Sequence, residues 1–296
     1  MGCRPQQRKM TIMDTGSKNK ISCTIEQQDA TGLNSAGPMP LYGVFLFQGQ
    51  GSLRVDFIDY TFEGFTVLFT TPWQVLRFQP AADLTVRVLW FHADYYCIEQ
   101  HKKEVACNGL LFNNLYSQPF IPLDEGTYAE LQGLLDKLQG ELAFEDSYSQ
   151  AVARTYLQLI LALSSKAKIA SAKSPDLSET VMLPSILGFK TLLETHFKEQ
   201  RSPAFYADQL GMTANAFSKK CKQQFNKSPS FLIQERVVLE AKKLIHLSLK
   251  SMKEIAAELN FDDEHYFSRY FKKHTGISPT AFRESVGIAQ IAYSSM

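Results

Sequence analysis

The sequence predicts a two-domain α+β protein: a strand-rich N-terminal domain that ends in a helical hairpin, followed by an all-helical C-terminal domain. Two observations carry this prediction. Short segments rich in β-branched and aromatic residues recur about every ten residues between 41 and 99. From residue 184 onward, apolar residues instead recur at helical spacing. A chain of 296 residues is long enough for two such domains, each with its own core.

The first part of the chain divides into a tail and a β domain. Residues 1–30 are polar, which indicates a tail rather than a secretory signal. The expected strands of the domain 31–170 are LYGVFLFQ (41–48), SLRVDFI (52–58), FTVLFTT (65–71), WQVLRFQ (73–79) and LTVRVLWFHADYYCI (84–98). Their regular spacing predicts a meander that is closed as a barrel or stacked as a sandwich.

A change of period over residues 127–170 predicts two amphipathic helices in a hairpin. One apolar stripe consists of Leu131, Leu134, Leu135 and Leu138, and the other of Val152, Tyr156, Leu159, Ile160 and Leu163. Two roles are open for this hairpin: it covers the core of the β domain, or it presents a stripe to a second copy of the chain. The polar segment 171–184, which contains a proline, is expected to be a linker.

Composition narrows the class of protein. The five cysteines are scattered without CxxC spacing, which indicates reduced thiols and argues against a disulfide framework or a zinc site. No apolar run is long enough for a membrane span, so we expect a cytoplasmic protein without a membrane partner. From residue 184 onward there are 16 basic and 11 acidic residues, against 15 and 19 in the remainder. This asymmetry is expected of a nucleic-acid-binding module attached to another domain.

An internal repeat occupies the C-terminal domain, 185–290. The segment 207–231 is similar to 256–282, with Ala207 and Leu210 matching Ala256 and Leu259. After a one-residue insertion, Ser218, Lys219, Lys222, Asn226, Ser228 and Pro229 match residues 50 positions later. Each copy predicts a short helix, a tight turn and a longer helix with a basic face, which is helix-turn-helix geometry. A long helix over 229–247 separates the two copies.

These motifs resemble the AraC/XylS family of bacterial transcription regulators. The resemblance lies in LGMTANAFSKK of the first copy, ERVVLEAKKLI of the long helix and FDDEHYFSRYFKKHTGISPTAFR of the second copy. The first copy departs from the family pattern, because Asn226 stands where glycine is usual and Cys221 where phenylalanine is usual. Since asparagine tolerates a left-handed conformation, we expect the turn at Asn226 to be preserved.

The resemblance implies a sequence-specific DNA-binding regulator, an activator rather than an enzyme, without a cofactor. Its partners would be double-stranded DNA, RNA polymerase, a small effector and a second copy of the chain. The positions that would read bases are Asn215, Ser218 and Lys219 in the first copy and Glu264, His265, Ser268 and Arg269 in the second. Side chains of these types form hydrogen bonds with base edges in the major groove. Lys222, Lys272 and Lys273 are better placed for phosphates.

The resemblance also implies a cupin-like barrel that binds the effector. Its candidate contacts are Trp73, Trp90, His92, Asp94 and Tyr96. His92, Asp94 and Glu99 are similar to a degenerate cupin metal motif, and histidine and carboxylate ligands suit iron, manganese or zinc. Because the second histidine and the flanking glycines of that motif are missing, we expect no metal site. A metal-dependent cupin enzyme with a helical appendage is the alternative function.

Overall fold

The computed structural model describes residues 23–29, 32–34, 38–56, 58–79, 84–96, 110–112, 115–116, 118–171 and 184–288. The N-terminal domain consists of β1 (Cys23–Asp29), β2 (Tyr42–Val55), β3 (Ile58–Thr70), β4 (Leu76–Phe78), β5 (Thr85–Phe91), β6 (Phe120–Leu123), α3 (Glu125–Glu141) and α4 (Ser147–Ser171). Residues 1–22 of the expected tail and the linker residues 172–183 lie outside the described residues, as do Cys97, Glu99, His101 and Cys107.

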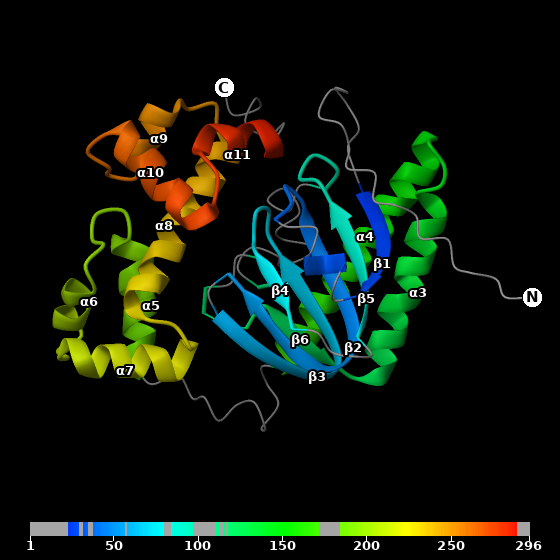
Figure 1. The fold of residues 1–296 in the computed structure, drawn as a ribbon, viewed down its shortest axis with the longest axis horizontal. Helices are drawn as coiled ribbons and strands as arrows, with labels where there is room; N and C mark the ends of the chain where they lie inside the picture. Colours follow the sequence, from blue (N-terminus) through cyan, green and yellow to red (C-terminus); the bar gives the residue numbers. More distant parts are fainter. Residues whose placement is uncertain are drawn as a thin grey trace, which may run out of the picture.

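The strands form one antiparallel sheet in the order β1-β5-β2-β3-β6, with β4 also pairing with β2. Within the described part of the chain β1 and β6 do not pair, so this sheet is open rather than the closed barrel that the sequence led us to expect. Figure 1 shows it as a curved sheet between the C-terminal helices and the α3–α4 hairpin.

The two strands expected over 41–48 and 52–58 are one strand, which corrects the predicted break at 49–51. The ladder of β2 and β3 runs without interruption from the pair Gly43–Thr70 to the pair Val55–Ile58. Gly49 bends the strand with a φ of 128°, and a Cβ at Gly51 would lie 2.9 Å from the Phe62 ring. These glycines therefore serve a bend and a close approach inside a strand, and the chain reverses after Val55.

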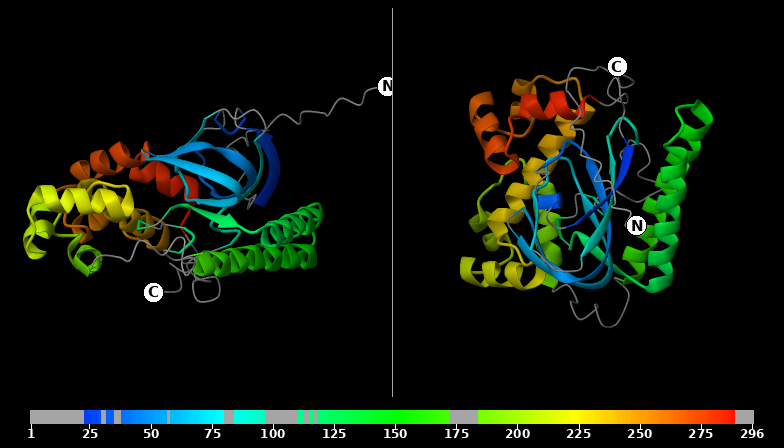
Figure 2. Two further views of the ribbon diagram at one scale, coloured as in Figure 1. Left: turned by 90° about the horizontal axis from the view of Figure 1, so that it is seen from below. Right: turned by 45° about the vertical axis from the view of Figure 1, so that its right-hand side comes forward.

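Both faces of the sheet are buried, which explains why its strands contain almost continuous apolar runs. Alternate residues enter different cores: Phe45 and Phe47 pack on one face, while Val44 and Leu46 pack on the other. The second face is covered by α3 and α4, and all four leucines of the stripe predicted in α3 are buried there. Figure 2 shows the two helices lying together along that face. The hairpin thus covers the core, as the first of its two expected roles required.

The stripe expected in α4 coincides only in part with its buried face, which shares Ile160 with it while Tyr156 and Leu163 are partly buried beside it. That face consists of Ala153, Leu157, Ile160, Leu161, Ser164, Ser165 and Lys168. Val152 and Leu159 are instead 40% and 42% exposed, and Tyr148 near the start of the helix is 84% exposed. Apolar residues occupy two sides of α4, and the sequence pattern alone did not distinguish the side that packs from the side that faces solvent.

The C-terminal domain is helical, as predicted. It comprises α5 (Pro184–His196), α6 (Pro203–Gln209), α7 (Ala214–Phe225), α8 (Pro229–Leu247), α9 (Met252–Glu258), α10 (Glu264–Thr275) and α11 (Pro279–Val286). The bounds of α6 to α11 agree with the predicted ones to within one residue at each end, whereas α5 begins two residues and ends four residues before the predicted helix 186–200. The helices share one core around α8, and Figure 1 shows α6 and α7 at one end of α8 with α9, α10 and α11 at the other. Among the described residues, no helix could cross a membrane.

Candidate DNA-binding surface and interdomain cavity

The first helix-turn-helix unit comprises α6 and α7. Its second helix begins at Thr213, whose hydroxyl accepts a hydrogen bond from the Ala216 amide at 3.3 Å. It ends at Asn226, which has a φ of 55° and donates its amide to the Lys222 carbonyl at 3.0 Å. The left-handed turn expected at Asn226 is therefore present. Phe217 and Cys221 lie on the buried side of the helix, so the sulfur at position 221 occupies a core position.

The second unit comprises α9 and α10 and repeats this construction with stronger caps. Ser251 and Glu254 form a capping box at the start of α9. Asp263 begins α10 and accepts the Tyr266 amide at 2.6 Å, and Gly276 ends the helix with a φ of 83°. Phe267 and Phe271 are fully buried. The repeated sequence thus folds into two units of the same design.

The predicted DNA-contacting residues lie on the solvent side of both reading helices. In α7, Asn215, Ser218, Lys219 and Lys222 are exposed. In α10, Glu264, His265, Arg269, Lys272 and Lys273 are exposed and Ser268 is half-buried. Spacings of three, four and seven residues place each set on one side of its helix, opposite the buried phenylalanines.

Arg269 has an aromatic neighbour, Tyr266, that is not among the predicted DNA-contacting residues. Its guanidinium carbon lies 6.0 Å from the centre of the Tyr266 ring, at the outer limit of a cation–π contact. Tyr266 is also among the exposed large apolar side chains of the molecule. An aromatic residue three positions before an arginine on the same helix is the signal that would have found this pair.

The β domain contacts α8 and the segments that flank the two units. Lys242 of α8 donates to the Pro72 carbonyl at 3.0 Å. Lys227, just before α8, donates to the Leu115 carbonyl at 3.2 Å and pairs with Glu235 at 2.8 Å. These bonds connect loops of the N-terminal domain with the helix that carries both units.

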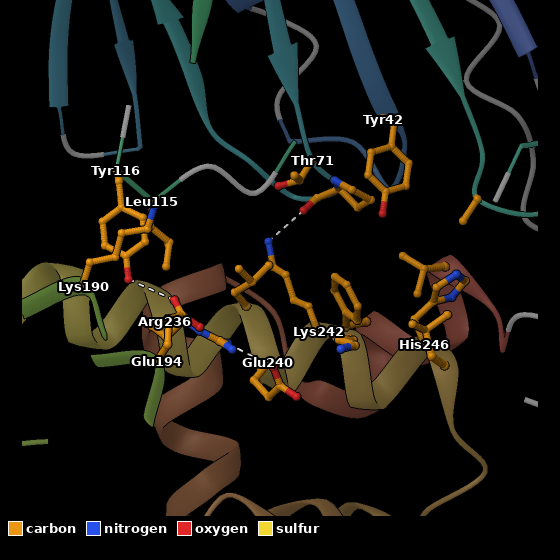
Figure 3. A pocket seen from close by; sticks show the side chains of 17 residues that line it. Tyr42, Thr71, Leu115, Tyr116, Lys190, Glu194, Arg236, Glu240, Lys242 and His246 are labelled. Atoms are coloured by element: carbon orange, nitrogen blue, oxygen red, sulfur yellow. Dashed lines mark hydrogen bonds and ion pairs between the residues drawn. The ribbon is translucent and has the colours of Figure 1, made fainter. Parts of the chain in front are cut away.

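A cavity of about 420 Å³ lies between the two domains. Figure 3 shows Tyr42, Thr71 and Tyr116 on the β-domain side and Arg236, Glu240, Lys242 and His246 on α8, with Lys190 and Glu194 at one end. Its charged lining comprises four cationic side chains and two acidic ones: Lys190, Arg236, Lys242 and Lys243, with Glu194 and Glu240. Arg236 pairs with both acids, at 2.8 and 3.0 Å. Leu115, Leu239, Phe282 and Val286 add apolar surface.

Burial perturbs the ionisable groups at this interface. Desolvation lowers the pKa of Lys242, although Asp56 and Glu235 oppose that change. Desolvation also raises the pKa of Glu235 to about 7 despite its ion pair with Lys227. Burial therefore disfavours the charged form of each of these two groups in the docked arrangement.

The candidate effector residues are divided among three places. Trp73, His92 and Asp94 lie at the interface with α11, where the His92 Nε2 is 3.3 Å from the Ser285 carbonyl oxygen. Trp90 is buried in one core of the β domain, and Tyr96 is buried in the other. Among these five, Trp73 lines a second cavity beside α8 and Trp90 a small one within the β domain.

The interdomain cavity was missed by sequence reasoning because α8 was interpreted only as a spacer. Glu235, Leu239, Lys242 and His246 are spaced by four, three and four residues, so they occupy one side of the helix. That row mixes charged and apolar residues, which was a signal that α8 has a second packed face.

Of the expected cupin-like metal motif, His92 and Asp94 do lie together, with 3.4 Å between Nδ1 and Oδ2. No group of three or more potential metal ligands occurs among the residues that the structure describes.

Two helix-turn-helix units with exposed basic faces, carried on one long helix, define a DNA-binding protein. Residues 206–285 match a family model described as a helix-turn-helix domain. The chain is 26% identical over 208 residues to the HTH-type transcriptional activator RhaR of Cronobacter sakazakii, covering 69% of this chain and 71% of that protein. RhaR of Escherichia coli K12 is 22% identical over 191 residues, covering 64% and 66% of the two proteins.

Among solved structures, the chain is similar to wild-type ToxT from Vibrio cholerae bound to an unsaturated fatty acid. The alignment covers 93% of this chain and 99% of the ToxT chain, with 14% sequence identity and a TM-score of 0.40. These matches are those of a DNA-binding transcription regulator, and the chain is similar to the AraC/XylS family. It aligns with about two thirds of the length of the E. coli RhaR proteins.

Proposed function

We propose that both units bind one DNA duplex from the same side, in successive major grooves. The observation that carries this proposal is the repeated exposed face on α7 and α10. The 19 residues of α8 span about 28 Å, which is close to the roughly 34 Å of one turn of B-DNA. Bases would be read by Asn215, Ser218, Lys219, Glu264, His265, Ser268 and Arg269, and phosphates bound by Lys222, Lys272 and Lys273.

The first test compares Arg269→Ala with Lys272→Ala on a duplex selected by the protein from a random pool and on unselected DNA. Loss of a bidentate arginine–guanine contact is worth about 1–3 kcal/mol and should relax sequence preference at one position. Loss of Lys272 should weaken binding to both duplexes alike and reduce the salt dependence by about one phosphate contact. Unchanged preference in Arg269→Ala would disprove this assignment of the reading face.

The interdomain cavity supports an effector that is both anionic and apolar. Cationic side chains outnumber acidic ones in its lining, and aliphatic and aromatic groups complete it. Because a ligand there would contact both the β domain and α8, it would stabilise one relation of the two domains over another. Only such a difference in affinity between two states could change DNA binding.

A medium-chain carboxylate tests this site directly. We expect decanoate to bind the purified protein in calorimetry and decanol to bind more weakly, because decanol lacks the charge. Lys190→Gln and Lys243→Gln, which alter the cavity lining, should weaken decanoate binding. Lys166→Gln changes an exposed lysine of α4 and serves as the matched control. Equal binding of acid and alcohol would contradict an anionic effector.

We also propose that the protein is a cytoplasmic homodimer that activates transcription through RNA polymerase, and that its β domain is cupin-like although its sheet is open. The exposed apolar side of α4, with Tyr148, Val152 and Leu159, supports the dimer. The alternative, a metal-dependent cupin enzyme, makes a different prediction. A stoichiometric transition metal that is lost in His92→Ala, together with absent DNA binding, would favour that alternative.

A further inference from the structure

The connection between α5 and α6, residues 197–202, is fixed in the core of the first unit. Phe197 is buried in the core of the C-terminal domain, and the Arg236 guanidinium lies 3.8 Å from the centre of its ring. The fully buried Tyr206 of α6 donates its hydroxyl to the Gln200 carbonyl at 2.7 Å. Two points of this connection are therefore held by neighbouring helices, Phe197 by α8 and Gln200 by α6.

Arg201 extends from this connection to the turn of the second unit. Its guanidinium donates to the carbonyl of Leu259, and to that of Asn260 at 3.0 Å. The same group lies 3.8 Å from the centre of the Phe261 ring. These three residues form the turn that leads from α9 into the reading helix α10. A planar guanidinium can donate to two carbonyls while it stacks on a ring, which an ammonium cannot do.

Two lysines support the same end of α9. Lys198, also in the connection, pairs with Glu258 at 3.3 Å, and Lys250 pairs with the same carboxylate. Cations beside the last carbonyls of a helix interact favourably with its negative end. Two residues of the α5–α6 connection thus bind the end of α9, and Figure 1 shows this connection extending toward α9 and α10.

The internal repeat makes this arrangement asymmetric. Arg201 and Lys250 occupy the same position of the repeat, each immediately before the serine at the N-terminus of α6 or α9. Both side chains nevertheless reach the C-terminal end of α9, in the second unit. The arginine of the first copy therefore acts across the repeat rather than within its own unit.

We propose that Arg201 is a positioning residue that fixes the relative orientation of the two reading helices. It thereby fixes the spacing that the protein accepts between two half-sites, which are the DNA segments bound by the first and by the second unit of one chain. The α8 helix alone joins the units end to end, whereas Arg201 adds a second connection beside it. This inference rests on the proposal that both units bind one duplex. An extra base pair between the half-sites would move one of them by about 3.4 Å and rotate it by about 34°.

The experiment measures spacing selectivity. The probe is a duplex selected from a random pool by the full-length wild-type chain, together with the same duplex carrying one inserted base pair between the half-sites. For wild type, Arg201→Ala and Arg201→Lys we measure the affinity for the selected duplex divided by the affinity for the duplex with the inserted base pair. We expect both substitutions to reduce this ratio at least about fivefold, the lower end of usual coupling between sites. A loss of stability alone would lower both affinities and leave their ratio unchanged.

Lys198→Ala keeps the inference testable if Arg201→Ala folds poorly, because it removes only a partly exposed ion pair of the same connection. It should reduce the ratio too, but by a smaller factor.

A further duplex with one half-site scrambled separates this inference from the function on which it rests. If wild type binds that duplex as well as the intact one, two-unit binding is wrong, and the inference with it. If wild type requires both half-sites and the ratio is unchanged in all three variants, only the role of Arg201 is overturned.

Discussion

The indole nitrogen of Trp73 donates a hydrogen bond to the hydroxyl of Ser285 at 3.1 Å and so joins the β domain to α11, the helix that follows the second unit. Trp73 has a φ of 64°, a conformation that costs a bulky residue about 1–3 kcal/mol. Its amide donates to the Met39 carbonyl at 2.8 Å, which helps to hold this conformation. His92 reaches the backbone of the same serine. The helix that follows the second reading helix is thus held by the β domain.

Removing the Ser285 hydroxyl should weaken this docking. A hydrogen bond of this kind contributes about 0.5–1.5 kcal/mol, so Ser285→Ala should expose Trp73 to solvent in a larger fraction of molecules. Because the chain has two tryptophans, Trp90→Phe leaves Trp73 as the only indole reporter. We expect its fluorescence to shift to longer wavelength in Ser285→Ala. Ser230→Ala, at an exposed position of α8, should leave the spectrum unchanged.

Docking of the domains should also depend on pH. Burial disfavours the imidazolium of His92, but its hydrogen bond and charge interaction with Asp94 outweigh that effect, so the pKa of His92 is raised above 6.5. The pKa of Glu235 is raised from 4.5 to about 7, chiefly by burial. In the docked protein each of these two groups therefore keeps its proton to a higher pH than a free side chain does, and the Ser285 backbone contributes to this at His92. The stabilisation from Glu235 is complete below about 4.5 and is lost as the pH rises to about 7, and that from His92 is lost above 6.5.

The measurement is the Trp73 fluorescence of the Trp90→Phe protein between pH 5 and pH 8. We expect the spectrum to shift to longer wavelength as the pH rises. Glu235→Gln, which keeps the shape but not the titration, should make this change smaller. The charged or titratable groups that face the two sites are Asp94 and His246 near His92, and Asp56, Lys227 and Lys242 near Glu235. A spectrum that shifts in the opposite direction would show that docking releases protons.

The exposed apolar side of α4 gives a prediction about association. Leu159→Lys places a charge within the stripe of Tyr148, Val152 and Leu159 and should convert a dimer into monomers in sedimentation experiments. Ala204→Lys introduces the same charge at an exposed position of α6, in the other domain. It should leave the sedimentation coefficient unchanged. Equal behaviour of the two variants would mean that α4 is not the interface.

The C-terminal fold could be predicted closely because its local signals agree with one another. Serine, threonine or aspartate immediately precedes each of the helices α6 to α11. These caps, and apolar residues at helical spacing, depend only on neighbours in the chain. The exposed position of Arg269 followed from the same spacing, since Phe267 and Phe271 define the buried side.

The β domain and the interface could not be predicted so well because they depend on contacts between distant residues. Gly49 and Gly51 read as a turn in the sequence, and only pairing with β3 shows that the strand continues through them. The cavity arises where α8 meets loops near Thr71 and Leu115, more than 100 residues away in the chain. Likewise, nothing local to Arg201 indicated that its partners are the carbonyls of Leu259 and Asn260.

Asn226 provides the last prediction, because it is the position at which the first unit departs from the second. It ends α7 with a φ of 55°, where Gly276 ends α10 with a φ of 83°. A residue with a Cβ pays roughly 1–2 kcal/mol in this left-handed region, and asparagine pays less than alanine. Asn226→Ala should therefore lower the free energy of unfolding in urea by about 1 kcal/mol, whereas Asn226→Gly should leave it equal or higher.

Gly276→Ala is the matched change in the second unit. A Cβ at Gly276 meets no atom within 4 Å, so the cost of this substitution would come from the backbone alone. If Asn226→Gly also left affinity for the first half-site unchanged, the turn would not limit DNA binding by the first unit. A gain in that affinity would show that the asparagine restrains it.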